Sequence, residues 1–204
     1  MPQPRRRLPV NAVRVATKAA AAESAATHVA LLRGINVGGK HMVPMVHLAA
    51  AFESLGCTAV KTLLQSGNVV FRAPTAARSA AALTKRIETL LCTRFGFDVP
   101  VVLRTALEMQ AVLHGNAFPH AATTAVSVAF LATAPAATRV AALDPQRSPG
   151  DAFVVKGREV YLHLPNGAAR SKLTTAWLDS ALQTTSTVRS VQTVQRLAEC
   201  CTAP

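Results

Sequence analysis

Two short hairpin signals divide this chain into halves that repeat one order of expected elements. The segments Ser66–Phe71 and Lys156–Tyr161 each carry a glycine near the tip, and Phe71 and Tyr161 fall at the same step. A glycine at such a tip supplies the positive φ that a tight hairpin turn needs. In both halves a strand and a helix come before the hairpin, and a helix and a strand follow it. The sequence therefore predicts the order βαββαβ twice.

The expected elements follow from hydrophobic periodicity and from the turn residues between the periodic segments. In the first half they are strands at 28–35, 59–65, 69–72 and 99–103, and helices at 44–55, 74–95 and 105–113. In the second half they are strands at 125–131, 152–155, 159–164 and 187–189, a short helix after Pro135, and helices at 170–182 and 191–200. We expect an α+β protein with a duplicated ferredoxin-like fold, in which each βαββαβ half is an antiparallel sheet with helices on one face, and a C-terminal helix.

The domain boundaries follow from composition. We expect a first half at 28–114, a linker loop at 115–123, and a second half with the C-terminal helix at 124–200. Residues 1–27 hold five basic residues, one glutamate and three prolines, which indicates a disordered basic tail. An Arg-rich segment almost without acids also resembles a mitochondrial transit peptide, and an over-long predicted start would look the same.

Charge and cysteine content limit the classes of protein. The formal charge of +12 favours anionic partners, although solubility alone explains such a surplus. The four cysteines have no C-x-x-C spacing, which favours reduced thiols and a cytoplasmic location. The six histidines are dispersed, so we expect no metal and no cofactor. No run approaches the roughly 18 apolar residues of a membrane helix, so we expect no membrane partner.

A glycine-rich loop follows the first expected strand. Gly34, Gly39 and Lys40 match the glycine and lysine positions of a phosphate-binding loop, but His41 stands where a Ser or Thr would bind magnesium. We therefore do not expect ATP or GTP hydrolysis. Glycine N–H groups can still approach an anion, with basic side chains beside them; a solvated turn is the alternative. The candidate ligand-binding residues are Arg33, Gly34, Asn36, Gly38, Gly39 and Lys40.

The tip of the first hairpin adds three polar side chains, those of Gln65, Ser66 and Asn68. The turn needs its glycine and is helped by the asparagine, whereas Gln65 and Ser66 indicate binding. Ser66 lies outside a G-x-S-x-G elbow and has no His or Asp near it in the sequence, which argues against a serine nucleophile. The glutamates are isolated and suggest no acid–base pair.

A third candidate is the start of the helix expected at 170–182. Ser171 could cap this helix, and Arg170 and Lys172 flank it, so the three residues form a potential phosphate or carboxylate site. Arg189, on the following short strand, could join them. A capped amphipathic helix explains the same residues.

Two segments resemble motifs of a known family. Val29–Gly39, with the sequence Val-Ala-Leu-Leu-Arg-Gly-Ile-Asn-Val-Gly-Gly, resembles the opening motif of the domain of unknown function 1697 family, and Leu64–Phe71 resembles its second motif. Weaker similarity continues to about residue 199. The resemblance implies a bacterial-type cytosolic protein with a duplicated ferredoxin-like fold, and it implies no activity, cofactor or catalytic residue. Arg189–Val194 departs from the family's usual Arg-Asn-Trp-Asn-Thr-Val, so a function tied to that motif would differ here.

Three function classes remain open. The first hypothesis is a binding module for a small anionic ligand, bearing a phosphate or a carboxylate, where the glycine loop meets the first hairpin. The second is a transferase or hydrolase that uses Ser66, Lys40 or Arg33. The third is nucleic-acid binding through the basic surface, although the aromatic-rich strand that stacks bases is missing. The sequence does not indicate an oligomeric state.

Overall fold

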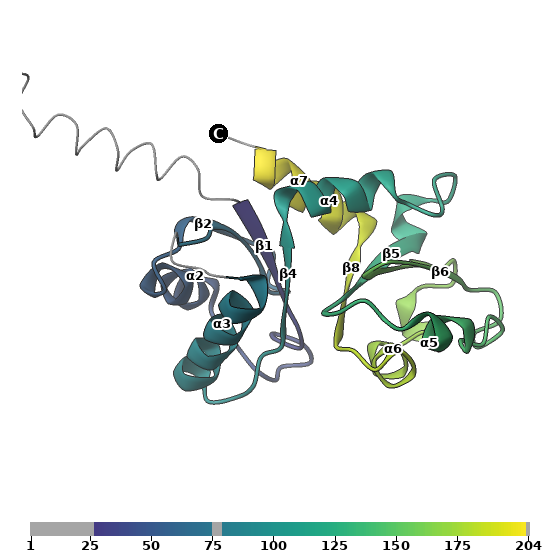
Figure 1. Cartoon of the computed structure of the whole chain (residues 1–204), viewed down its shortest axis with the longest axis horizontal. Helices are drawn as coiled ribbons and strands as arrows, with labels where there is room; N and C mark the ends of the chain where they lie inside the picture. Colours follow the sequence, from purple (N-terminus) through teal and green to yellow (C-terminus); the bar gives the residue numbers. More distant parts are fainter. Residues whose placement is uncertain (1–26, 75–78, 203–204) are drawn as a thin grey trace, which may run out of the picture.

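The computed structural model describes residues 27–74 and 79–202 of the 204-residue chain (Figure 1). The tail expected at residues 1–27 lies outside them, except for Thr27, which begins the first strand. None of the helices in the described ranges is long and apolar enough to cross a membrane.

The first half has the expected order of elements. Its sheet is antiparallel with the strand order β2-β3-β1-β4. The strands are β1 (Thr27–Leu32), β2 (Thr58–Leu63), β3 (Asn68–Arg72) and β4 (Val101–Thr105). The helices are α2 (Met45–Ser54), α3 (Ala80–Phe95) and α4 (Ala106–His114). The helix expected at 74–95 thus begins at residue 80, behind the N-cap Ser79, and positions 75–78 lie outside the described residues.

The second half repeats this order, with the sheet order β6-β7-β5-β8. The strands are β5 (Val126–Leu131), β6 (Ala152–Lys156), β7 (Glu159–His163) and β8 (Ser186–Ser190). The helices are α5 (Ala137–Ala141), α6 (Thr175–Leu182) and α7 (Val191–Thr202), with short 3-10 turns η1 (Thr123–Ala125) and η2 (Ala168–Arg170). The prediction of two βαββαβ halves with antiparallel sheets and a C-terminal helix is confirmed.

The strand pairing corrects the alignment of the two hairpins. Asn68 lies opposite the penultimate residue of β1, and Glu159 lies opposite the penultimate residue of β5. Asn68 therefore corresponds to Glu159, and Val70 corresponds to Tyr161. The expectation that Phe71 and Tyr161 fall at the same step is wrong by one residue, because the glycine directly precedes β3 in the first hairpin but stands two residues before β7 in the second.

The fold is held together by three clusters of buried side chains. One lies between the first sheet and α2 and α3, and another lies between the second sheet and α5 and α6. The middle cluster joins the inner faces of both sheets with α4 and α7. In Figure 1 these two helices lie side by side across the top of the molecule, between the halves. Each half thus buries one sheet face under its own helices and the other against its neighbour.

The helices α4 and α7 pack against each other and bridge the two halves. α4 follows β4 of the first sheet, yet the Tyr161 hydroxyl of the second sheet donates to Val112 O of α4 at 2.9 Å. α7 follows β8 of the second sheet and packs against β1 and β3 of the first. At the end of α4, a Cβ on Gly115 would lie 2.6 Å from the Tyr161 hydroxyl oxygen, so this contact requires a glycine. The helices α4 and α7 therefore tie the two halves together.

The helix expected at 170–182 is shorter than the sequence predicts. α6 begins at Thr175, and its N-cap is the hydroxyl of Thr174. Ser171, the expected cap, instead accepts a hydrogen bond within the segment that precedes the helix. The prediction of a helix N-terminus flanked by Arg170 and Lys172 is therefore wrong. Both hydroxyl residues are good caps, so local sequence does not choose between them.

Candidate functional site

The glycine loop after β1 is compact and largely left-handed. Two backbone hydrogen bonds of 3.1 Å close it, from Asn36 N to His41 O and from Lys40 N to Val37 O. Glycine enters the left-handed region readily, and most other residues seldom do. Five residues have φ between 50° and 72°: Gly34, Asn36, Gly38, Gly39 and His41.

The side chain of Asn36 fastens this loop to the first hairpin. Its Nδ2 donates to Gln65 O at 2.8 Å and to Val43 O at 3.0 Å, and its Oδ1 accepts from Val43 N at 2.7 Å. The two motifs singled out in the sequence therefore meet in the folded chain. Because three of the four hydrogen-bonding positions of the amide are used by the protein, Asn36 holds the shape of the site.

Gly67 and Asn68 are buried parts of the same structure. A Cβ on Gly67 would lie 2.8 Å from the side chains of both Leu32 and Ile35, and its φ is +76°. The Asn68 side chain donates to Leu63 O at 2.8 Å and to the Ser66 hydroxyl at 3.0 Å. Close packing and a buried amide thus explain these two residues of the motif without a ligand.

Arg189, near the end of β8, binds the turn of this hairpin from the other half. Its Nε donates to Asn68 Oδ1 at 2.6 Å, and its Nη2 donates to the carbonyl oxygens of Leu32, Ser66 and Gly67 at 2.6, 3.0 and 3.3 Å. No carboxylate of residues 27–74 or 79–202 forms an ion pair with it. Burial lowers the pKa of this guanidinium to about 10, so it remains charged at neutral pH.

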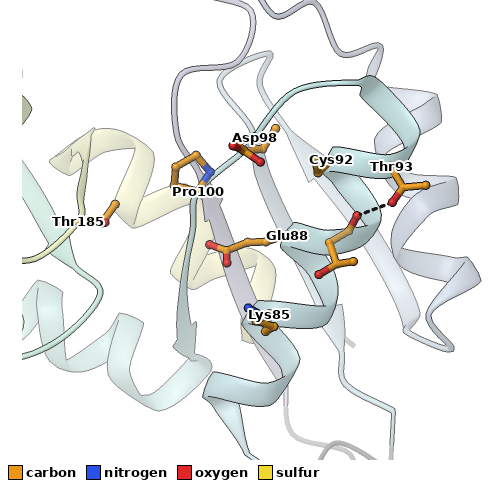
Figure 2. A pocket seen from close by; sticks show the side chains of 9 residues that line it. Lys85, Glu88, Cys92, Thr93, Asp98, Pro100 and Thr185 are labelled. Atoms are coloured by element: carbon orange, nitrogen blue, oxygen red, sulfur yellow. Dashed lines mark hydrogen bonds between the residues drawn. The ribbon is translucent and has the colours of Figure 1, made fainter.

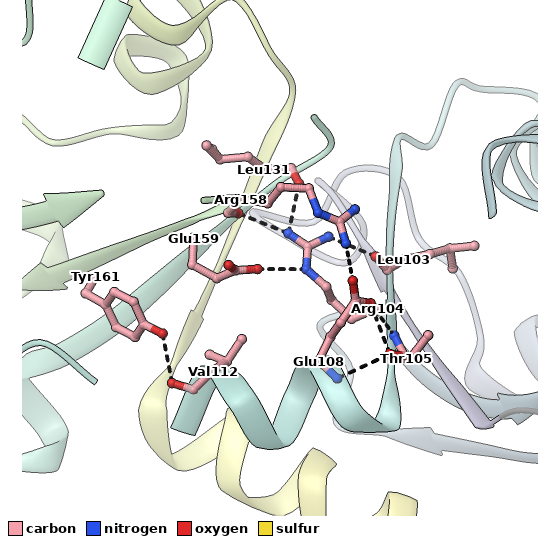
Figure 3. Close-up of polar contacts among 9 residues, drawn as sticks. All are labelled: Leu103, Arg104, Thr105, Glu108, Val112, Leu131, Arg158, Glu159 and Tyr161. Carbon is pink, nitrogen blue, oxygen red and sulfur yellow. Dashed lines mark hydrogen bonds and ion pairs between the residues drawn. The ribbon is translucent and has the colours of Figure 1, made fainter. Parts of the chain in front are cut away.

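Arg104 occupies the corresponding place in β4 and reaches into the second half (Figure 3). Its Nη2 donates to Leu131 O at 2.9 Å and to Arg158 O at 3.0 Å, and its Nε binds Glu159 at 2.9 Å. Leu131 ends β5 as Leu32 ends β1, so each half places an arginine against the end of the first strand of the other half. Burial lowers the pKa of Arg104, and the carboxylate of Glu159 opposes this shift.

The two arginine sites differ in charge. The arginine under the first hairpin meets the neutral amide of Asn68, whereas the arginine under the second meets the carboxylate of Glu159. Arg158 in the second hairpin is also neutralised, by an ion pair with Glu108 of α4. Burial alone would raise the pKa of Glu108, but hydrogen bonds from Thr105 and the charge of Arg158 outweigh it and hold the pKa below its usual value. Of the two buried arginines, Arg189 is therefore the one without a carboxylate partner among residues 27–74 and 79–202.

Sequence reasoning missed this network, because it treated Glu108 and Glu159 as isolated residues. A signal was present, since each half ends its last strand with an apolar residue, an arginine and a hydroxyl residue directly before a helix: Leu103–Thr105 and Val188–Ser190. In both places the hydroxyl residue accepts a hydrogen bond from the first turn of that helix. Alignment of the halves by this pattern would have paired the two arginines.

The other candidate residues of the loop and hairpin lie at the surface. Arg33 is partly buried and forms an ion pair with Asp179 of α6, so the second half neutralises its charge. Lys40, Gln65 and Ser66 are exposed. Within the described part of the chain, Lys40 forms no ion pair.

The segment Arg170–Lys172 lies apart from this surface. It follows β7, whose last residue, His163, pairs with the first residue of β5. Asp179, which forms the ion pair with Arg33, accepts a hydrogen bond from Ser186, the first residue of β8. Ser186 pairs with the last residue of β5. The third candidate segment and the glycine loop therefore lie toward opposite ends of the second sheet.

A cavity of about 500 Å³ opens between α3 and the second half (Figure 2). Glu88 Oε1 accepts a hydrogen bond from Val101 N at 2.9 Å beside it. Pro100 O accepts from Arg33 N at 2.9 Å, so the cavity adjoins the start of the glycine loop. The lining residues are Lys85, Glu88, Thr89, Cys92, Thr93, Asp98, Val99, Pro100 and Thr185.

The surroundings of Ser66, Cys92, Phe71 and Tyr161 bear on the enzyme and nucleic-acid hypotheses. The Ser66 hydroxyl accepts from Asn68 Nδ2 at 3.0 Å, and no base in those ranges bonds it. The hydrogen bond with Asp98 raises the pKa of the Cys92 thiol, which therefore stays protonated. Phe71 and Tyr161 are 0% and 2% exposed, so bases cannot stack on them. No three His, Cys, Asp or Glu residues of the described chain are grouped to hold a metal ion.

The fold and the two buried arginines define a duplicated ferredoxin-like protein, and comparison with known proteins places it further. Residues 25–161 match the family described as "Protein of unknown function (DUF1697)", and the chain belongs to this family. The expected family is thereby confirmed. The altered segment Arg189–Val194 lies beyond the matched range.

Comparison with solved structures supports the same fold. The conserved bacterial protein SP0830 from Streptococcus pneumoniae is 19% identical and has a TM-score of 0.67, with 86% of this chain and 98% of that chain covered. At this identity the similarity concerns the fold alone. No functionally curated protein gives a significant match.

Proposed function

We propose that this protein binds a small anionic ligand, bearing a phosphate or a carboxylate, where the glycine loop meets the first hairpin. The observation that carries the proposal is the buried charge of Arg189, which bonds the backbone of Ser66 and Gly67. No carboxylate in the described part of the chain balances it by an ion pair. An anion roughly 8 Å from a buried cation gains about 2 kcal/mol at an effective dielectric constant of about 20.

The glycine loop and the first hairpin also carry exposed polar groups. Lys40 adds a second cation, and Gln65 and Ser66 offer an amide and a hydroxyl. Nothing lies within 4 Å of the position that a Cβ would take on Gly38 or Gly39, so a ligand can approach their backbone N–H groups closely. The loop and the hairpin together therefore supply charge, side-chain donors and accessible backbone to one anion.

The second hairpin supports the proposal by contrast. It stands on the same kind of arginine, but Glu159 neutralises Arg104 and Glu108 neutralises Arg158. Among the described residues, the buried arginine under the first hairpin thus has no carboxylate partner, whereas the buried arginine under the second has one. A purely structural need for a buried arginine would not require this difference.

The enzyme and nucleic-acid hypotheses lack an observation of this kind. Ser66 has no hydrogen-bonded base within the described ranges, and the strand aromatic residues Phe71 and Tyr161 are buried. A cytoplasmic location accords with the four cysteines, which are free thiols.

Binding can be tested with inorganic phosphate, citrate and adenosine monophosphate by calorimetry and thermal unfolding. A ligand at 100 times its Kd should raise the free energy of unfolding by about 2.7 kcal/mol. Lys40→Gln should weaken binding about tenfold, while Lys172→Gln, an exposed lysine on the separate segment, should leave it unchanged. The proposal fails if none of the three anions binds, or if both variants weaken binding equally.

A further inference from the structure

Glu88 of α3 and Asp179 of α6 occupy corresponding places in the two halves. Glu88 Oε1 accepts from Val101 N at 2.9 Å, and Asp179 Oδ1 accepts from Ser186 N at 2.8 Å. Val101 and Ser186 each begin the last strand of their half and pair with the last residue of its first strand. Each carboxylate therefore holds the same backbone N–H group at the boundary between the halves.

Only one of these carboxylates receives a cation from the opposite half. The second oxygen of Asp179 binds Arg33. The residue that corresponds to Arg33 is Ala132. Arg33 N donates to Pro100 O, directly before β4, and Ala132 N donates to Thr185 O, directly before β8, both at 2.9 Å. An alanine side chain cannot bind a carboxylate, and Glu88 forms no ion pair with any residue of 27–74 or 79–202.

The cavity of about 500 Å³ lies at this carboxylate. Glu88 and Thr185 line it from the two halves, and Figure 2 shows the Glu88 carboxylate pointing from α3 toward the side where Thr185 lies. The charged lining residues are Glu88, Asp98 and Lys85, so the lining carries a net negative charge in a chain of formal charge +12. Ligand sites favour such clefts between structural units, and the local charge selects a cation.

We infer that this cavity is a second binding site, and that it takes a small molecule bearing a guanidinium or a primary amine, held by Glu88. The ion pair between Arg33 and Asp179 is the protein's own version of this contact at the corresponding place. A guanidinium can donate two parallel N–H bonds to a carboxylate, and the threonine hydroxyls of the lining can accept its remaining donors. The site differs from the proposed anion site in position and in the sign of its charge.

Butylguanidinium and butylamine are suitable probes, and the neutral butylurea is their control. NMR titration of the full chain should show saturable shifts around the cavity with both cations, and binding at least tenfold weaker with butylurea. Glu88→Gln keeps an oxygen acceptor for Val101 N and should weaken binding of the cations at least tenfold. Glu53→Gln, which changes an exposed glutamate of α2, should leave binding unchanged.

Ala132→Arg supplies the missing guanidinium from the protein itself. Residue 132 is exposed, so the variant should fold, pair with Glu88 and abolish probe binding, whereas Ala169→Arg, an exposed control, should retain it. The inference is overturned if butylguanidinium does not bind, or if it binds Glu88→Gln or Ala132→Arg as well as it binds the unmodified protein. Lys40→Gln should not affect these probes, so the outcome is independent of the anion proposal.

Discussion

Replacing Arg189 by methionine tests how the two halves are joined. Methionine retains much of the aliphatic volume but removes six hydrogen bonds, four of which end in the first half. Among the described residues, Ser66 O and Asn68 Oδ1 have no other donor. The change therefore leaves buried oxygen atoms without a partner at the boundary between the halves.

The size of the effect follows from two opposing terms. An unsatisfied buried acceptor costs about 1–3 kcal/mol, and Arg189→Met leaves two acceptors without a described donor, Ser66 O and Asn68 Oδ1. Removal of a cation that is buried without a carboxylate offsets part of this loss, as its pKa, lowered by burial to about 10, indicates. We therefore expect Arg189→Met to reduce the free energy of unfolding by about 3 kcal/mol.

Urea unfolding measures this difference. The fluorescence of Trp177, the single tryptophan, reports on the second half, and circular dichroism reports on both. Arg196→Met changes an exposed arginine of α7 and should alter stability by less than about 0.5 kcal/mol. Because α4 and α7 cross between the halves, both signals should show one transition. If Arg189→Met is no more destabilising than Arg196→Met, the argument for this network is refuted.

Three further predictions concern groups whose surroundings the fold determines. Burial raises the pKa of Tyr161, the only tyrosine, to about 12. Because the pKa of the phenol in the unfolded chain is about 10, the free energy of unfolding should fall as pH rises between these two values. Tyrosinate absorbance measures this pKa, and a native titration near 10 would contradict the burial. Gly67→Ala should lower the free energy of unfolding by about 1 kcal/mol more than Gly157→Ala. Both glycines have positive φ, but of the two only Gly67 has neighbours 2.8 Å from the position of a Cβ. Equal losses of thermal stability in the two variants would contradict this prediction. The contacts that lower the pKa of Glu108 stabilise the fold at pH values above the pKa of the unfolded carboxyl, about 4.3. This stabilisation is lost as pH falls through the lower pKa of the folded state. Glu108→Gln should therefore flatten this part of the dependence of stability on pH, and an unchanged dependence would contradict the prediction.

The elements were predictable where local chemistry decides them. The glycine turns, the alternating strands and the Thr105 cap each depend on residues within a few positions, and the cap forms as a capping box with Glu108. The start of α6 was not predictable, because Ser171 and Thr174 are equally suitable caps and the turn at η2 decides between them. The hairpin alignment failed for a related reason, since strand register depends on the whole sheet.

The candidate site was predictable in position but not in the roles of its residues. The sequence predicted that the glycine loop and the first hairpin form the candidate site, and the Asn36 side chain joins the two segments in the fold. Which side chains are buried inside this contact and which are exposed was not visible, because Asn68 and Gln65 look alike in a linear pattern. The fold buries one under Arg189 and leaves the other at the surface.

The sequence by itself therefore determined the order of strands and helices and the duplication of the halves, because both are written in local periodicity. Only the tertiary structure decided which charges are balanced. Arg189 meets Asn68 across 121 positions of the chain, and Arg33 meets Asp179 across 146. Such pairs exist only once the two halves have docked, since burial and long-range partners are properties of the packed chain. Among the described residues, Arg189 without a carboxylate partner and Glu88 without a cation are both products of that docking.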